Sequence, residues 1–185
     1  MNIEHYRMAK SFAGEYGVFL GISWSITFCL MAYGMAHFST IPMLAGIFLY
    51  FLLPVIACYL SWRFKQHLPY GDNVSYPIAF MFVFLMFTNS CLITAAVEFC
   101  YFKFIDQGLL LATLKEITTS PEIAGQYRQM GMSQILDSMN QSLDLLAGMS
   151  PFDLVIYLFS NNLLTSLILC LPTAYIAHRK SRKIR

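Results

Sequence analysis

The sequence has few charged residues. Asp, Glu, Lys and Arg make up 12% of its 185 residues, about half the share found in an average soluble domain. Apolar residues make up 57%, and a soluble core of this size cannot remove so much apolar surface from water. This composition excludes a soluble globular enzyme, a disordered regulator and a secreted disulfide scaffold. It indicates an integral membrane protein.

The sequence also lacks the motifs of catalysis and metal binding. It has no CxxC, HExxH or GxSxG motif, no Gly-rich phosphate loop and no pair of carboxylates at catalytic spacing. Its five cysteines lie inside or at the edge of apolar runs, which favours free buried thiols over disulfides. The net charge of +2 is too small to indicate a nucleic-acid partner. We therefore expect no enzymatic activity, no cofactor and no metal site.

Four long apolar runs occupy residues 17–36, 43–62, 77–104 and 152–177. About 20 helical residues cross the hydrocarbon core of a bilayer, and none of the runs alternates with the period of two that a barrel strand requires. The length of the first run favours a retained helix over a cleaved signal peptide. The sequence therefore predicts an all-α integral membrane protein, with four transmembrane helices in a single membrane domain over residues 1–185.

The basic residues predict the orientation. Nine of the twelve lysines and arginines lie near the two termini or in the loop between the second and third runs, and these are Arg7, Lys10, Arg63, Lys65, Arg179, Lys180, Arg182, Lys183 and Arg185. Basic residues near helix ends favour the cytoplasmic side. We expect both termini in the cytoplasm and residues 106–150 outside. The last five form a basic tail suited to anionic lipids or a cytoplasmic partner.

The outer segment, residues 106–150, is acidic and helical in pattern. Gly108 predicts a break after the third apolar run, and Ser120-Pro121-Glu122 has the cap, first-turn proline and acidic residue that begin a helix. Apolar positions from 123 to 146 recur at helical spacing and predict one amphipathic helix. We expect this helix to end at Gly148, and Ser150 to cap the last transmembrane helix.

Among the polar residues within the apolar runs, four are singled out, Asn89, Glu98, Asn161 and Asn162, and Ser90 lies beside Asn89. Counted from the helix ends, Asn89 has a similar depth to Asn161 and Asn162, which predicts hydrogen bonds between the third and fourth helices. We expect Asn89 to face Asn162 or the adjacent polar positions Thr165 and Ser166. A polar substrate path is the functional alternative. Glu98 is a functional candidate because carboxylates are rare in membranes. It also lies near the outer boundary, where water or lipid head groups can solvate it, and a partner such as Lys103 or a neighbouring asparagine is enough to explain it.

Small residues recur at four-residue spacing on the first helix, at Gly17, Gly21 and Ser25. Such a face lets two helix backbones approach closely in a membrane. A four-helix protein needs close contacts of this kind between its own helices. We therefore favour packing within the chain over homodimerisation through this face.

Three stretches resemble a bacterial membrane family catalogued as domain of unknown function 4199. They are YGDNVSYP at 70–77, YFKFID at 101–106, and PFD at 151–153 followed by SNN at 160–162 and the basic C-terminal end. The resemblance implies a four-helix inner-membrane protein with an outer helical insertion between helices three and four. It implies no established activity, but it does suggest a link to polyprenyl-phosphate glycosyl transfer.

Two functions agree with these features. The first is a non-enzymatic scaffold or accessory subunit of a membrane complex, in contact with membrane lipids and with a membrane-protein partner through the outer segment or the basic tail. The alternative is a small lipid or solute transporter that acts as a homo-oligomer. The transporter would use the mid-membrane amides and the helix interruptions at Pro54 and Pro172.

Overall fold

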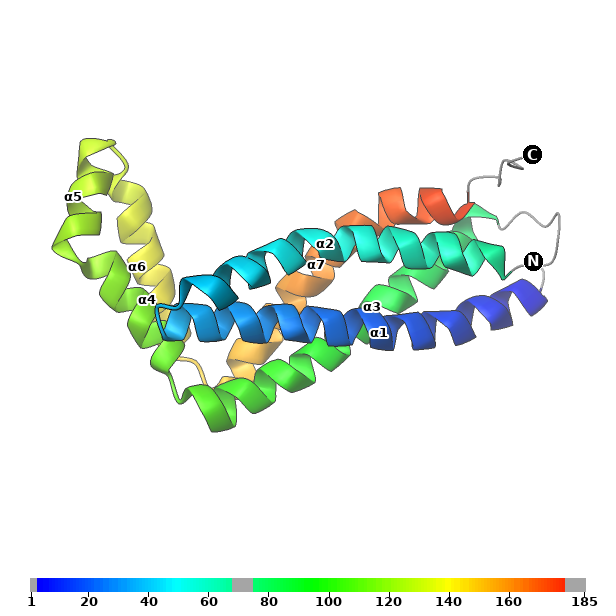
Figure 1. The fold of residues 1–185 in the computed structure, drawn as a ribbon, viewed down its shortest axis with the longest axis horizontal. Coiled ribbons are helices and arrows are strands. Elements are labelled where there is room, and N and C mark those ends of the chain that lie inside the picture. Colours follow the sequence, from blue (N-terminus) through cyan, green and yellow to red (C-terminus); the bar gives the residue numbers. More distant parts are fainter. Residues whose placement is uncertain (1–2, 68–74, 179–185) are drawn as a thin grey trace.

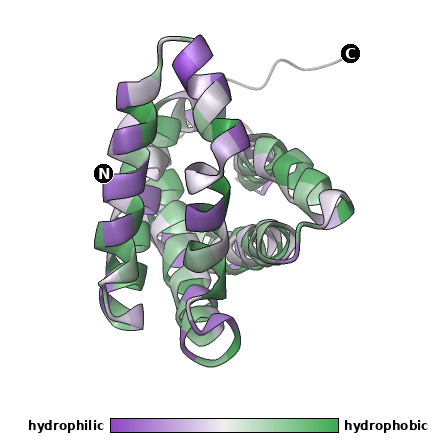
Figure 2. Ribbon diagram, turned by 90° about the vertical axis from the view of Figure 1, so that its left-hand side faces the viewer, coloured by the Kyte–Doolittle hydropathy of each residue, from purple (hydrophilic) through white to green (hydrophobic). Residues whose placement is uncertain are grey.

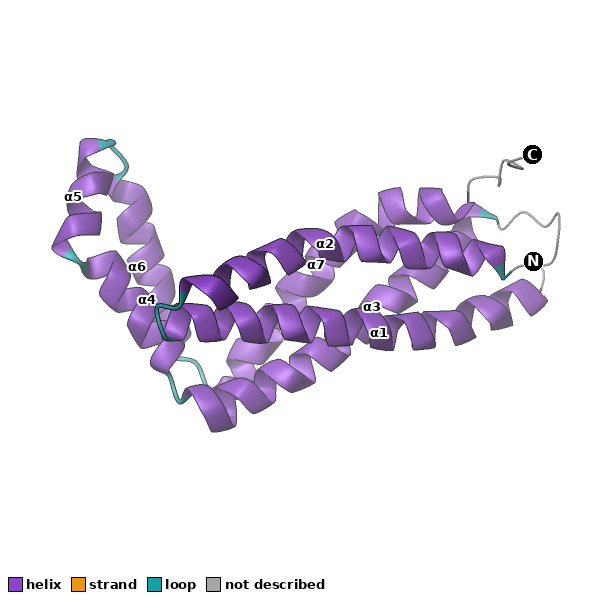
Figure 3. Cartoon of the chain, viewed as in Figure 1, coloured by secondary structure: helices purple, strands orange, loops and turns teal. Residues whose placement is uncertain are grey.

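A computed structural model describes residues 3–67 and 75–178, and every element within these ranges is a helix (Figure 3). The elements are α1 (Ile3–Ala36), α2 (Thr40–Gln66), α3 (Tyr76–Cys100), the π-helix η1 (Tyr101–Asp106), α4 (Leu109–Thr119), α5 (Pro121–Gln129), α6 (Ser133–Ala147) and α7 (Pro151–His178). Four helical segments are long and apolar enough to cross a membrane: Tyr6–Ala36, Thr40–Gln66, Tyr76–Asp106 and Pro151–His178. The predicted fold class is confirmed.

The four long helices form a ring. Helix α3 packs against α1 and α7, and α2 packs against the same two helices. Figure 1 shows the start of α1 and the end of α7 at one end of this bundle, and α4, α5 and α6 at the other. Each long helix contains a stretch without Asp, Glu, Lys or Arg, namely residues 16–36, 40–62, 76–97 and 154–177. Hydrophilic residues are most evident on the helices nearest the viewer in Figure 2, in front of a mostly hydrophobic bundle.

The end of the bundle that holds the start of α1 is closed by aromatic stacking. Phe64 of α2 and Phe82 of α3 stack with their ring centroids 4.0 Å apart, and both are fully buried. Ala9 and Ala13 of α1 are buried in the same cluster. Alanine has little side-chain volume, so α1 can lie close to these rings.

The third membrane segment ends two residues before Gly108, as predicted. Gln107 and Gly108 both have left-handed backbone conformations, with φ of 48° and 89°, and α4 starts at Leu109. The buried carboxylate of Asp106 holds this junction, because its oxygens accept hydrogen bonds from the backbone N–H of Gly108 (3.1 Å) and of Leu110 (3.0 Å). These bonds satisfy free donors at the start of α4.

The outer segment forms a hairpin of three helices. Ser120 caps α5 as predicted, since its Oγ accepts from the backbone N–H of Ile123. The single amphipathic helix predicted over residues 123–146 is wrong. Gly131 has a φ of 70° and ends α5 in a Schellman motif, in which Met132 N–H donates to the carbonyl of Tyr127 at 2.8 Å. The chain therefore turns back, and α6 runs beside α4.

The return into the bundle follows the predicted capping chemistry. Helix α6 ends at Ala147, just before Gly148. Ser150 Oγ accepts from the backbone N–H of Asp153 at 3.2 Å and donates to the Asp153 carboxylate at 2.6 Å. With Pro151 in the first turn, these contacts begin α7.

Candidate functional site

The asparagines predicted to pair across the membrane do not meet. Asn89 Nδ2 donates to the backbone carbonyl of Ala13 on α1 at 3.4 Å, whereas Asn162 Nδ2 donates to Glu98 Oε1 at 3.5 Å. The predicted contact of Asn89 with Asn162, Thr165 or Ser166 is wrong, because Asn89 bonds to α1 and the register of α3 against α7 sets Glu98 level with Asn162. Asn89 lies nine residues before Glu98. At 1.5 Å per residue, Asn89 is about 13.5 Å closer to the start of α3.

The Glu98 carboxyl lies inside the bundle. The residue is 3% exposed, and its second carboxylate oxygen, Oε2, has no hydrogen-bond partner among the described residues. Lys103, one of the two partners considered from the sequence, instead places its Nζ 5.2 Å from the ring centroid of Phe99 and 5.5 Å from that of Phe104. The partner of Glu98 is an asparagine, Asn162, the other kind of residue considered from the sequence. Their hydrogen bond links α3 to α7.

A polar stripe on α3 leads to this carboxyl. Thr94 and Ser90, one and two turns before Glu98, are fully buried. Thr94 Oγ1 donates to the Ser90 carbonyl at 3.0 Å, while Ser90 Oγ has no hydrogen-bond partner within residues 3–67 and 75–178. Ser90 Oγ and Glu98 Oε2 together leave spare hydrogen-bonding capacity inside the bundle. A single carboxyl and an amide can hold two helices together, but they do not make a metal site.

The small-residue face of α1 packs on α3. A Cβ atom at Gly17 would lie 2.7 Å from Asn89 Cβ and 2.8 Å from the Met86 carbonyl oxygen, and one at Gly21 would lie 2.9 Å from Ile93 Cβ. Ser25 is buried, and its Oγ donates to the Gly21 carbonyl at 2.8 Å. The structure thus brings Gly17 and Asn89 together, a contact that sequence reasoning missed.

Asn161 has a different environment from its neighbour Asn162. It is exposed on the outward face of α7, and it makes no hydrogen bond to any described residue. The hydroxyl of the adjacent Ser160 has a partner within its own helix, since its Oγ donates to the Ile156 carbonyl at 2.8 Å. Of the four predicted intramembrane polar residues, Glu98 and Asn162 are brought together, Asn89 packs on α1, and Asn161 points away.

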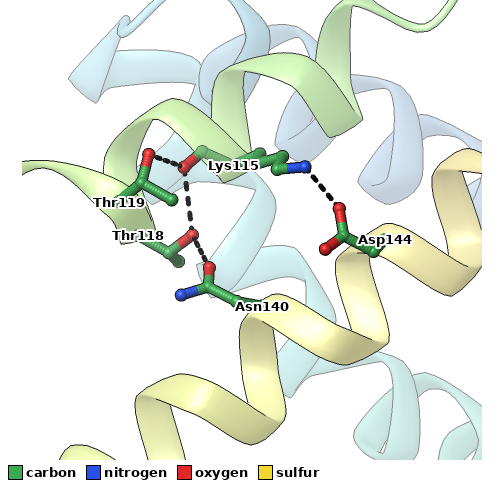
Figure 4. A network of polar contacts seen from close by, with 5 residues as sticks. All are labelled: Lys115, Thr118, Thr119, Asn140 and Asp144. Atoms are coloured by element: carbon green, nitrogen blue, oxygen red, sulfur yellow. Dashed lines mark hydrogen bonds and ion pairs between the residues drawn. The ribbon is translucent and has the colours of Figure 1, made fainter.

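Polar contacts brace the outer hairpin (Figure 4). Lys115 of α4 forms an ion pair with Asp144 of α6, and Thr118 Oγ1 donates to Asn140 Oδ1 at 2.6 Å. Both members of the ion pair are about half exposed, so it contributes little stability. Its effect is to set how α6 lies beside α4. Sequence reasoning missed these contacts because it expected one continuous helix.

An apolar groove of about 390 Å³ lies between α4 and α6. Two exposed apolar side chains of α6, Ile135 and Met139, form part of its wall. Large exposed apolar patches with polar surroundings mark interaction sites. The complete lining is Leu114, Thr118, Ile135, Ser138, Met139, Ser142 and Leu143.

Comparison with known families decides the assignment of the chain. The model of the family described as "Protein of unknown function (DUF4199)" matches residues 15–179. The chain belongs to the DUF4199 family. The match includes the hairpin as well as most of the bundle, in agreement with the resemblance found in the sequence. No curated protein and no solved structure matches this DUF4199 chain.

Two further predictions for the DUF4199 chain concern a metal site and the basic tail. Across residues 3–67 and 75–178, no cluster of three or more His, Cys, Asp or Glu side chains has the geometry to hold a metal ion. The basic tail, Arg179, Lys180, Arg182, Lys183 and Arg185, lies outside the described residues, as does the 70–74 part of the loop motif. The groove on the hairpin and the pair formed by Glu98 and Asn162 are the sites on which the proposals below depend.

Proposed function

We propose that the protein is a non-enzymatic scaffold or accessory subunit of a membrane complex, and that it binds a membrane-protein partner through the α4–α6 hairpin. The observation that carries this proposal is the exposed apolar groove on a hairpin that is already braced. Ile135 and Met139 are large apolar side chains, yet they are 52% and 40% exposed. A partner surface can cover them at little ordering cost because the hairpin is preorganised.

The partner class follows from the family resemblance. It suggests an enzyme of polyprenyl-phosphate glycosyl transfer, which is itself membrane-bound because its substrate carries a long lipid. The transporter alternative has less support. Asn89, Asn161 and Asn162 point in different directions, and α2 and α7 continue through Pro54 and Pro172. These features do not form one polar path.

A substitution in the groove tests the proposal. Met139→Asp places a charge in the apolar groove and is expected to remove a stoichiometric partner when the tagged protein is purified from membranes in mild detergent. Leu145→Asp is the matched control, because Leu145 is on the same helix and 70% exposed but does not line the groove. Quantitative mass spectrometry measures the partner. If the unsubstituted protein always purifies alone, or if both variants lose the partner equally, the proposal is wrong.

We also propose that both termini lie on the cytoplasmic side of a bacterial inner membrane, with the hairpin outside. Arg7, Lys10, Arg63 and Lys65 gather at the opposite end of the bundle from α4–α6, as the distribution of basic residues favours. In a cysteine-free variant, Ser138→Cys on the hairpin is expected to react with a membrane-impermeant thiol reagent on intact spheroplasts. Gln66→Cys at the other end should react only after permeabilisation, and the reverse pattern would invert the orientation.

A further inference from the structure

The outward face of α7 carries a regular stripe. Its members are separated alternately by four and three residues, and all are exposed: Tyr157, Asn161, Leu164, Ile168, Leu171 and Tyr175. This is the spacing of the a and d positions along the seam between two supercoiled helices. Five of the six side chains are large and apolar or aromatic.

An apolar stripe alone does not indicate a protein contact in a membrane, since lipid-facing residues are apolar too. Helix α2 is an example of an apolar stripe that lipid alone can cover. It has an exposed stripe with the same spacing, which includes Leu44, Phe48, Phe51 and Val55. The α2 stripe has no amide, and lipid is sufficient to cover it. The difference between the two faces is Asn161.

Asn161 lies deep in the membrane segment. It is ten residues from Pro151 and seventeen from His178, about 15 Å and 25 Å along the helix at 1.5 Å per residue. This depth is within a hydrocarbon core about 30 Å thick. The amide is exposed there and makes no hydrogen bond within the described residues. Lipid tails offer it no partner, which favours a contact with another polypeptide.

We propose that α7 pairs with α7 of a second copy of this chain, with the Asn161 amides of the two copies hydrogen-bonded to each other. An amide both donates and accepts hydrogen bonds, so it is complementary to itself. A two-fold axis brings the same stripe of both copies together. A single asparagine at an a position sets the register of such a pair. This interface uses no residue of the α4–α6 groove and does not depend on the proposed function.

Cross-linking in native membranes tests the pairing. In the full-length, cysteine-free chain, Ile168→Cys is expected to form a disulfide-linked dimer when a mild oxidant is added. Val55→Cys on the α2 stripe is the matched control, since the two positions are 71% and 59% exposed. Dimer from Ile168→Cys but not from Val55→Cys supports the proposal. Equal yields, no dimer, or a product with a different polypeptide overturns it.

The amide is tested separately. Asn161→Leu is expected to raise the dimer dissociation constant about threefold to twentyfold, the effect of losing an interhelical hydrogen bond in a membrane. Asn161→Gln keeps an amide and should retain most of the affinity. Energy transfer between labelled copies, diluted in lipid vesicles, measures the constants, and circular dichroism verifies the fold. An Asn161→Leu protein that dimerises as tightly as the unsubstituted chain would show that the amides do not pair.

Discussion

Replacing Gly17 with leucine is expected to lower the free energy of unfolding by about 3 kcal/mol, the upper part of the range for overpacking a well-packed contact. Even a methyl group there would approach the Met86 carbonyl oxygen to 2.8 Å and Asn89 Cβ to 2.7 Å. The first of these atoms is backbone, so it cannot turn aside. To admit the side chain, α1 and α3 must separate along their whole contact. Thermal unfolding in detergent, followed by circular dichroism, measures the loss.

Gly14 provides the matched control, since a Cβ atom there would meet nothing within 4 Å. Gly14→Ala is expected to be neutral or to stabilise α1 by up to about 1 kcal/mol, because alanine loses less conformational freedom than glycine in a helix. A Gly17→Leu protein as stable as the Gly14→Ala protein would show that α1 and α3 are not in close contact at Gly17.

Asn162→Leu is expected to lower the free energy of unfolding by about 2 kcal/mol. It removes the hydrogen bond that the described part of the chain offers the Glu98 side chain, and the residue is 3% exposed. A buried polar group without a partner costs about 1–3 kcal/mol. Replacing both residues, Glu98→Leu with Asn162→Leu, should recover much of this loss, because no orphaned carboxyl then remains. Reversible unfolding in mixed detergent micelles yields the four values of the double-mutant cycle.

Strong non-additivity is therefore the expected signature of this pair. Ser160→Ala, on the same helix, is the control and should change stability by less than about 0.5 kcal/mol, because the Ser160 hydroxyl only bonds to its own helix backbone. If the losses in the cycle add, Glu98 and Asn162 do not act together, and Glu98 must have another partner.

Local chemistry explains why the helix boundaries could be predicted. The Ser120 cap, the break at Gly108 and the Ser150–Asp153 box all depend on residues within four positions of each other. The apolar runs are likewise a property of contiguous sequence, so the four long helices could be counted before the structure was known. The helix ends are set by the backbone groups that each end leaves without partners.

Contacts between helices could not be predicted in the same way. The partner of Asn162 depends on the register of α3 against α7, and a shift of about two and a half turns exchanges Asn89 for Glu98. The two depths were counted from opposite ends, which introduces an error of that size because the third segment, Tyr76–Asp106, has 31 residues. At 1.5 Å per residue it is about 46 Å long, well beyond a hydrocarbon core about 30 Å thick. The hairpin was missed for a related reason, because apolar periodicity is unchanged by one glycine in a turn, Gly131.

The lengths of the charge-free stretches of the four long helices indicate which bilayer thickness the protein matches. They are about 21–24 residues long, or about 31–36 Å at 1.5 Å per residue, against about 30 Å for an average hydrocarbon core. Because the four lengths are so similar, hydrophobic mismatch acts on the bundle as one body. A modest common tilt fits it to an average bilayer, whereas a thinner one imposes a penalty on all four helices at once, which favours partition into thicker membrane regions.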